Sequence, residues 1–229
     1  MIKAVAVVIP AHDEEALLPA CLAAVDQAAC TLESLPVCTV VTADACADRT
    51  ARVASDSGAV VVKISARNVG AARHAGMQEA LRRLRHLDAA EVWLATTDAD
   101  TLVPSDWLSR QLRYAAQGWD AVVGTIAVTD WTGHPPEAAP LFQLHYGNGP
   151  RTHPHVHGAN LGISAEAYLA AGGFRPHQTA EDHALVKALE NAGHRILRTT
   201  EVSVVTSARR KARAPMGFSN YLSTLAGAR

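Results

Sequence analysis

The sequence predicts a single α/β domain with a mostly parallel central sheet and helices on both faces. Apolar runs alternate with helix-like segments through residues 1–100, as in a chain that forms parallel strands joined by crossover helices. Runs such as residues 5–9 are continuously apolar, which is typical of strands buried on both faces. The 229 residues, of which 48% are hydrophobic, are enough for one sizeable domain with a real core.

The first strand is expected at residues 5–9, where five apolar residues follow one another. A helix follows, because Leu17, Leu18, Cys21, Leu22 and Val25 recur at helical spacing, and Asp13 is the residue we expect to cap it. The apolar run at residues 37–41 predicts the second strand.

Asp48 is expected to cap a short helix that continues through residue 53, because aspartate is favoured at that position. The β-branched run 60–64 predicts the third strand. Residues 71–87 are rich in alanine, leucine and arginine, which indicates a helix with a basic outer face. The apolar run 92–95 predicts the fourth strand.

The second half loses this regular alternation, and its expected elements are less uniform. They are a helix at 105–116, a strand at 121–128, a long loop at 133–158 around a short helix at 138–145, a short strand at 158–163, a helix capped by Ser164, a turn at 172–174, a helix at 181–191, and one or two strands within 196–206. The loop is rich in proline, glycine and histidine, and we expect it to lie over an acceptor site.

Composition argues against several classes of function. The formal charge of −1 gives no electrostatic basis for binding nucleic acid. No apolar run approaches the length of a membrane span, and a strand that starts so near Met1 predicts no signal peptide. The four cysteines have no Cys-x-x-Cys spacing, so we expect reduced thiols in a cytoplasmic protein.

Two carboxylates, Asp98 and Asp100, follow the fourth strand directly. In a parallel sheet such strand ends share one crevice with the residues that end the other strands, here His12, Glu14 and Asp44. Carboxylate oxygens suit Mg²⁺ or Mn²⁺, which keep further positions open to phosphate, so a donor that carries a diphosphate fits the pair. The alternative is an ordinary solvated acidic turn.

Three further sites each have a functional and a structural interpretation. Asp44 could accept a hydrogen bond from a nucleobase N–H or simply stabilise a turn. Arg73, in a segment that opens a helix, could bind a phosphate or be a surface charge. Glu181 and Asp182 could supply a general base or only favour the dipole of the helix that they begin.

Five segments in fixed order resemble the motifs of family 2 glycosyltransferases. They are Val-Ile-Pro-Ala-His-Asp-Glu-Glu at 8–15, the segment 44–50, Asp98-Ala99-Asp100, Gly158-Ala159-Asn160 with Gly172-Gly173-Phe174, and Glu181-Asp182. The resemblance covers about residues 3–207. It implies a GT-A-like fold and an inverting transfer from a nucleotide-diphospho-sugar, most often UDP- or GDP-linked, to an acceptor hydroxyl.

The resemblance also implies a division of the chain. Residues 1–207 would be the catalytic domain, with a nucleotide-binding half at 1–100 and an acceptor half at 101–207. The residues themselves indicate that 208–229 is a basic tail with an amphipathic helix at 218–225. That helix could pack on the domain as a terminal helix, cover the active site or lie on the inner face of a bacterial membrane, and the acceptor could be lipid-linked.

The resemblance assigns roles to individual residues. Pro10, Ala11, His12, Glu14 and Asp44 would hold base and ribose; Arg73 would lie at the phosphates; Asp98 would touch ribose or metal-bound water; Asp100 would bind Mg²⁺ or Mn²⁺; Asp182 would be the general base; and Gly158, Asn160 and Glu181 would lie on the acceptor side.

The chain also departs from the family pattern. Ala43, Ala45 and Cys46 replace residues of the usual nucleotide-binding motif. No late histidine offers a third metal ligand, and the segment 206–210 could replace that ligand with Arg209 and Arg210 on the diphosphate. Two other functions remain open from the sequence. One is a sugar-phosphate nucleotidyltransferase, which would need a glycine-rich basic loop after the first strand, and the other is a non-catalytic nucleotide-sugar binder.

Overall fold

A computed structural model describes residues 1–146 and 152–209, so the tail predicted at 208–229 lies outside the description from residue 210 onward. The strands are β1 (Ala4–Ala11), β2 (Val37–Asp44), β3 (Val60–Ile64), β4 (Val92–Thr96), β5 (Thr101–Leu102), β6 (Ala121–Ala127), β7 (Leu161–Ser164) and β8 (Ile196–Thr206). The helices are α1 (Leu18–Cys30), α2 (Thr50–Asp56), α3 (Val69–Arg83), the 3₁₀ turn η1 (Ala89–Glu91), α4 (Trp107–Ala115), α5 (Ala138–His145), α6 (Ala165–Ala170) and α7 (Glu181–Asn191).

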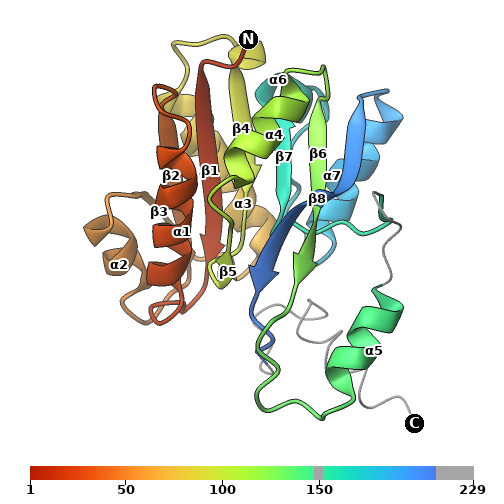
Figure 1. Ribbon diagram of the computed structural model, residues 1–229. Coiled ribbons are helices and arrows are strands. Elements are labelled where there is room, and N and C mark those ends of the chain that lie inside the picture. Colours follow the sequence, from red (N-terminus) through yellow and green to blue (C-terminus); the bar gives the residue numbers. More distant parts are fainter. Residues whose placement is uncertain (147–151, 210–229) are drawn as a thin grey trace.

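The strands form one mixed, mostly parallel sheet in the order β3-β2-β1-β4-β7-β6-β8-β5 (Figure 1). β1, β2, β3 and β4 run parallel, and β6 runs parallel to β8. β7 is antiparallel to both of its neighbours, and β5 is antiparallel to β8 at the edge. The α/β class predicted from the alternating pattern is therefore confirmed.

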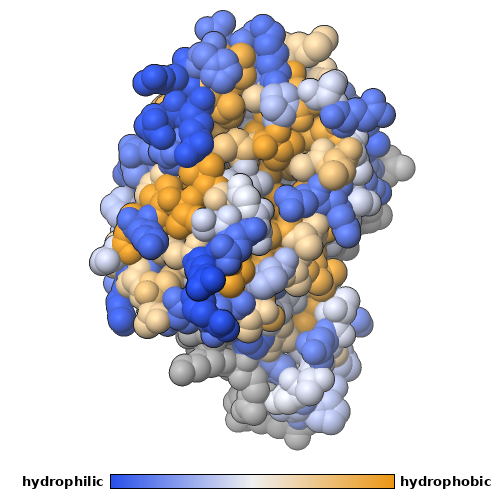
Figure 2. Space-filling view, turned by 90° about the vertical axis from the view of Figure 1, so that its left-hand side faces the viewer, coloured by the Kyte–Doolittle hydropathy of each residue, from blue (hydrophilic) through white to orange (hydrophobic). Residues whose placement is uncertain are grey.

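Helices cover both faces of the sheet, as predicted. Side chains of β1 alternate between two cores: Val5, Val7 and Ile9 pack with α1 and α4 on one face, whereas Ala6 and Val8 pack with α3, α6 and α7 on the other. This alternation explains why the first strand is apolar without interruption. β3 is an edge strand, and the face of the molecule on that side mixes small hydrophobic and hydrophilic areas (Figure 2).

Both predicted aspartate caps are wrong in detail. Asp13 has a left-handed backbone, with φ of 52°, and its carboxylate accepts a hydrogen bond from the Ala47 N–H, 2.7 Å away, instead of one from α1. The helix begins only at Leu18. Asp48 lies two residues before the first residue of α2, and Arg49 takes the N-cap position. The Asp48 carboxylate accepts hydrogen bonds from the N–H groups of Glu15 and Thr50.

Residues 101–207 contain one strand that the sequence pattern did not reveal. β5 has only two residues, and it pairs with the end of β8 through a Thr101–Thr206 hydroxyl contact of 3.0 Å. β7 begins at Leu161 rather than at residue 158, because residues 157–160 form a turn closed by the Asn160 N–H and the His157 carbonyl. In the described ranges, no helix is long and apolar enough to cross a membrane.

The tight packing of α3 on the sheet leads to a first prediction. A Cβ on Gly76 would lie 2.4 Å from Val8 Cγ1 and 2.7 Å from Thr42 Oγ1. We therefore expect Gly76→Ala to destabilise the protein by about 1–3 kcal/mol despite the better helix propensity of alanine. Urea unfolding measures the change. The exposed Gln78→Ala on the same helix should alter stability by less than about 0.5 kcal/mol, and equal stabilities of the two variants would contradict the packing argument.

Candidate active site

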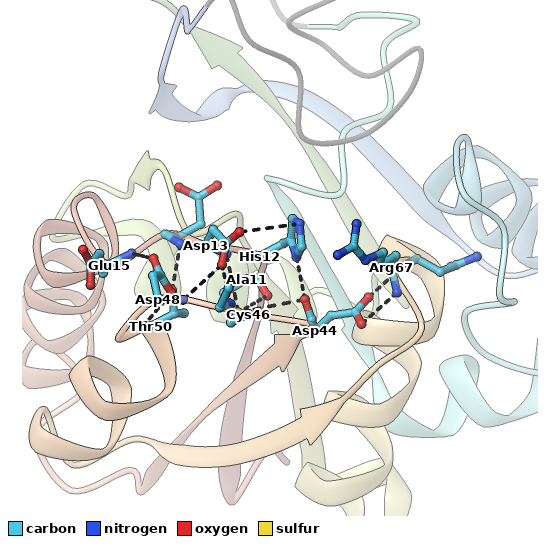
Figure 3. A network of polar contacts seen from close by, with 12 residues as sticks. Ala11, His12, Asp13, Glu15, Asp44, Cys46, Asp48, Thr50 and Arg67 are labelled. Carbon is cyan, nitrogen blue, oxygen red and sulfur yellow. Dashed lines mark hydrogen bonds and ion pairs between the residues drawn. The ribbon is translucent and has the colours of Figure 1, made fainter.

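The carboxyl ends of β1 and β2 are joined by a network of polar contacts (Figure 3). His12 Nδ1 lies 2.6 Å from the Asp44 carbonyl oxygen, so the imidazole bridges the two strand ends. Three of the residues predicted to hold base and ribose, Pro10, Ala11 and His12, follow one another at the end of β1 and just beyond it. The network therefore fixes the shape of the crevice where the sequence places a nucleotide.

The Asp44 side chain is buried and engaged by its own protein. Its two oxygens accept hydrogen bonds from the backbone N–H groups of Ala66, Arg67 and Asn68, at 2.7, 2.9 and 2.7 Å. These bonds stabilise a sharp loop in which Arg67 has φ of 48°. Asp44 thus positions the loop between β3 and α3 beside the predicted nucleobase site, and the Arg67 side chain on that loop is exposed.

A second group of polar side chains lies on the α1 side of His12. Asp13, Cys46 and Asp48 have ligand atoms within 4.8 Å of one another, a spacing that could suit a metal ion. Their atoms already accept backbone hydrogen bonds: Asp13 from Ala47, Cys46 from Asp13, and Asp48 from Glu15. The cluster therefore ties the loop after β1 to the loop after β2, at the side of an open hollow of about 450 Å³.

Asp98 and Asp100 lie in the turn that joins β4 to β5. The Asp100 side chain is only 8% exposed, and its carboxylate lies 3.0 Å from Nη2 of Arg209. Burial raises the pKa of Asp100 to about 6, with the neighbouring carboxylates of Asp98 and Glu14 acting in the same direction and Arg209 opposing them. Asp100 is therefore a buried carboxylate with both acidic and cationic neighbours.

Arg73 is a buried link between the two predicted acidic pairs. Its side chain is 4% exposed, with Nη2 2.5 Å from Asp98 and Nη1 paired with Glu181. The guanidinium also lies 5.8 Å from the ring centre of Phe174. A Cβ on Gly158 would come within 2.4 Å of it, so the glycine permits this close approach. In this structure carboxylates engage the arginine that the sequence placed at a phosphate.

The adjacent acids at the start of α7 have different surroundings. Glu181 is buried against Arg73, and burial raises the pKa of its carboxyl. Asp182 is half-buried, and its Oδ2 accepts a hydrogen bond of 2.8 Å from the Gly158 N–H. Consecutive helical residues diverge by about 100°, so only one can face a given direction. Asp182 is thus the more accessible carboxylate of the pair.

Asn160, predicted on the acceptor side, is fully buried and cross-links three elements. Its Nδ2 donates to the carbonyls of Thr125 and Val202, at 2.8 and 2.9 Å, and its Oδ1 accepts from the Trp107 indole, at 2.9 Å. Asn160 therefore stabilises the packing of β6, β8 and α4 next to the Gly158 turn.

Sequence reasoning gave no site role to Tyr146 or to the histidines near it. The Tyr146 hydroxyl lies 2.8 Å from His157 Nε2, and its ring stacks on that of His155 with centres 3.9 Å apart. Burial lowers the pKa of His157 to about 4, although nearby Asp182 opposes the shift. The sequence pattern that could have indicated this group is the alternation of His153, His155 and His157, because alternate side chains of an extended segment face the same way.

The family model described as "Glycosyl transferase family 2" matches residues 6–169. The chain belongs to glycosyl transferase family 2. The matched range contains the loops after β1 and β2, the Asp98–Asp100 turn and the Gly158 turn of this family 2 glycosyltransferase. Glu181, Asp182 and Arg209 lie beyond the matched range.

Solved structures support the GT-A-like fold of this family 2 enzyme. Residues 1–349 of S. aureus TarS, in complex with UDP-GlcNAc, superpose with a TM-score of 0.64 at 13% identity, covering 98% of this chain and 66% of that one. M. tuberculosis glucosyl-3-phosphoglycerate synthase, with Mn²⁺, UDP and glucosyl-3-phosphoglycerate, gives 0.56 at 18% identity, covering 98% and 76%. At such identities the likeness shows the fold alone. No curated protein matches the chain.

Proposed function

We propose that this family 2 glycosyltransferase moves a sugar from a nucleotide-diphospho-sugar donor, UDP- or GDP-linked, to an acceptor hydroxyl with inversion. The observation that carries the proposal is the bridge formed by Arg73, which holds Asp98 from the turn after β4 and Glu181 from the start of α7. It ties the turn that carries the proposed donor carboxylates to the helix start at Glu181, where the adjacent Asp182 is the proposed base. Transfer requires both, because the attacking hydroxyl and the departing diphosphate lie on opposite sides of the sugar carbon.

The loops after β1 and β2 support a donor nucleotide on one side of this assembly. Asp44 holds the β3–α3 loop through three backbone N–H groups, and a carboxylate oxygen can accept more than one hydrogen bond, so a base N–H can still reach it. His12 connects the two strand ends through the Asp44 carbonyl. We infer that Pro10, Ala11, His12, Glu14 and Asp44 contact or shape the base and ribose site. A nucleotide donor is supported by two similar structures, one of which holds UDP-GlcNAc and the other UDP.

The acidic turn fits a divalent cation. Asp98, Asp100 and Glu14 offer only hard oxygen donors. Burial is the main cause of the raised pKa of Asp100, and the neighbouring carboxylates of Asp98 and Glu14 add to it, so several acidic groups would attract a cation here. Asp100 would hold Mg²⁺ or Mn²⁺ directly, whereas Asp98, already paired with Arg73, would contact ribose or metal-bound water. When bound, the cation would offset charge that develops on the departing diphosphate.

Asp182 is the proposed general base. Its Oδ2 is oriented by the Gly158 N–H, which leaves further lone pairs of the carboxylate for an acceptor hydroxyl. Glu181 keeps Arg73 in place beneath it, and Gly158 and Asn160 form the supporting turn and floor. The acceptor is proposed as a hydroxyl compound, lipid-linked acceptors included. The proposed contact of the basic tail with a membrane concerns residues 210–229, which the structure does not describe.

The other two functions receive less support. A nucleotidyltransferase would need a glycine-rich basic loop after β1, but here that loop contains Asp13, Glu14 and Glu15. A binder without catalysis has no use for an oriented carboxylate such as Asp182, and it would not release nucleoside diphosphate from donor plus acceptor.

Removal of Asp100 tests the proposed donor site. Asp100→Ala is expected to abolish the part of donor affinity that depends on Mn²⁺, because the cation loses its direct carboxylate ligand. Calorimetric titration of UDP- and GDP-sugars, with Mn²⁺ and with chelator, measures this. Asp106, a half-exposed residue that pairs with Arg110, provides the control, and Asp106→Ala should leave affinity unchanged. If chelation has no effect on the native protein, the metal assignment is wrong.

A further inference from the structure

The side chain of Arg209 joins two acidic residues from distant parts of the chain. Its Nη2 lies 3.0 Å from Asp100 Oδ2, and its Nη1 pairs with Glu14, which is 195 residues away in the sequence. Both carboxylates are nearly inaccessible, at 8% and 5% side-chain exposure, whereas Arg209 itself is 26% exposed. The arginine thus lies at the open side of the acidic pair.

The main chain beside Arg209 is held firmly. Thr206 pairs with Thr101 across β8 and β5, the Ala208 carbonyl contacts His134 Nε2, and the Arg209 N–H donates to Ser207 Oγ at 3.2 Å. A change of partner by Arg209 would therefore require rotation of its long side chain but no loss of these contacts at residues 206–209.

Charge balance makes this contact dependent on what else is bound. Buried carboxylates need a cation, and in the structure Arg209 is the cation at Asp100. A divalent cation that binds without a diphosphate must displace the Arg209 guanidinium from the Asp100 carboxylate. The metal ion and the guanidinium would then lie side by side as two unshielded positive charges. A diphosphate removes that conflict, because it supplies negative oxygens for both cations, and the planar guanidinium fork suits phosphate.

We propose that Arg209 is the resident counter-ion of Asp100 in the free enzyme and a ligand of the donor diphosphate in the complex, so that a divalent cation gains Asp100 only when a diphosphate is present. This inference rests on the proposed function, since it concerns the same donor site. It assigns Arg209 a binding role that makes metal and nucleotide affinities interdependent, as thermodynamic linkage requires.

The test is a pair of titrations on the full chain and on Arg209→Gln. Free Mn²⁺, followed by its electron paramagnetic resonance signal, is expected to bind the variant at least about tenfold more tightly than the native protein, because Asp100 is released. Uridine and guanosine diphosphate, titrated with Mn²⁺ by calorimetry, are expected to bind the variant at least about tenfold more weakly. Tighter binding of Mn²⁺ and weaker binding of the diphosphates by the same variant would show that Arg209 exchanges Asp100 for the diphosphate.

Controls separate this result from general effects of charge or folding. Arg113→Gln removes an exposed arginine that pairs with Glu201, and it should change neither affinity. Arg209→Lys keeps a positive charge beside Asp100, so it should still exclude free Mn²⁺ while losing the fork that contacts phosphate. If the native protein binds a diphosphate with Mn²⁺ but Arg209→Gln binds free Mn²⁺ no more tightly, the inference about Arg209 is overturned and the proposed function stands. If the native protein binds neither uridine nor guanosine diphosphate, both the inference and the proposed function are overturned.

Discussion

Replacement of Asp182 by asparagine is expected to lower turnover at least about a hundredfold while donor affinity stays nearly unchanged. The amide keeps the shape of the side chain and an oxygen that can accept from the Gly158 N–H, but it cannot take a proton from the attacking hydroxyl. The donor should be unaffected, because the proposed donor contacts lie on the loops after β1, β2 and β4 and at Arg209 after β8, and none of them is on α7. Turnover and donor affinity are measured separately, with a hydroxyl acceptor identified by release of nucleoside diphosphate.

Two variants on the same helix serve as comparison. Glu190→Gln, at the exposed end of α7, should retain native turnover. Glu181→Gln should lower turnover less than Asp182→Asn and should chiefly reduce stability, because Glu181 is buried against Arg73. Native turnover in Asp182→Asn, or a loss that comes entirely from donor affinity, would remove Asp182 as the base.

Loss of Arg73 is expected to have the largest effect on stability. Arg73→Gln leaves the buried Glu181 without its cation, and breaking a buried ion pair on one side typically costs about 3–5 kcal/mol. Urea unfolding gives the free energy directly. Arg82→Gln on the exposed face of the same helix is the matched control: it removes an ion pair with Glu79 and should cost less than about 1 kcal/mol.

The charge-preserving variant distinguishes two roles of Arg73. Arg73→Lys restores a cation but reaches only one carboxylate well, because an ammonium lacks the two-ended fork that spans Asp98 and Glu181. It should recover part of the stability and little of the turnover, if the arginine aligns the donor and acceptor sides. Equal recovery of both would mean that Arg73 only neutralises charge.

Much of the fold could be predicted from the sequence because the relevant information is local. Apolar runs such as those of β1 and β4 and the 3.6-residue periodicity of α1 reflect burial on two faces or on one, and each needs only a few neighbouring residues. The same locality placed Asp98 and Asp100 at a strand end and Glu181 and Asp182 at a helix start. Family membership and the α/β class followed from the order of these segments.

The partner of each charged side chain was decided only by the tertiary structure. Arg73 meets Glu181 across 108 residues and Arg209 meets Glu14 across 195, and no short pattern records which side chains then face one another. The sequence suggested a phosphate for Arg73 and a nucleobase for Asp44, but in the folded chain carboxylates engage the arginine and backbone amides engage the aspartate. The physical reason is that burial makes unpaired charge costly, so the nearest opposite group in space determines the role.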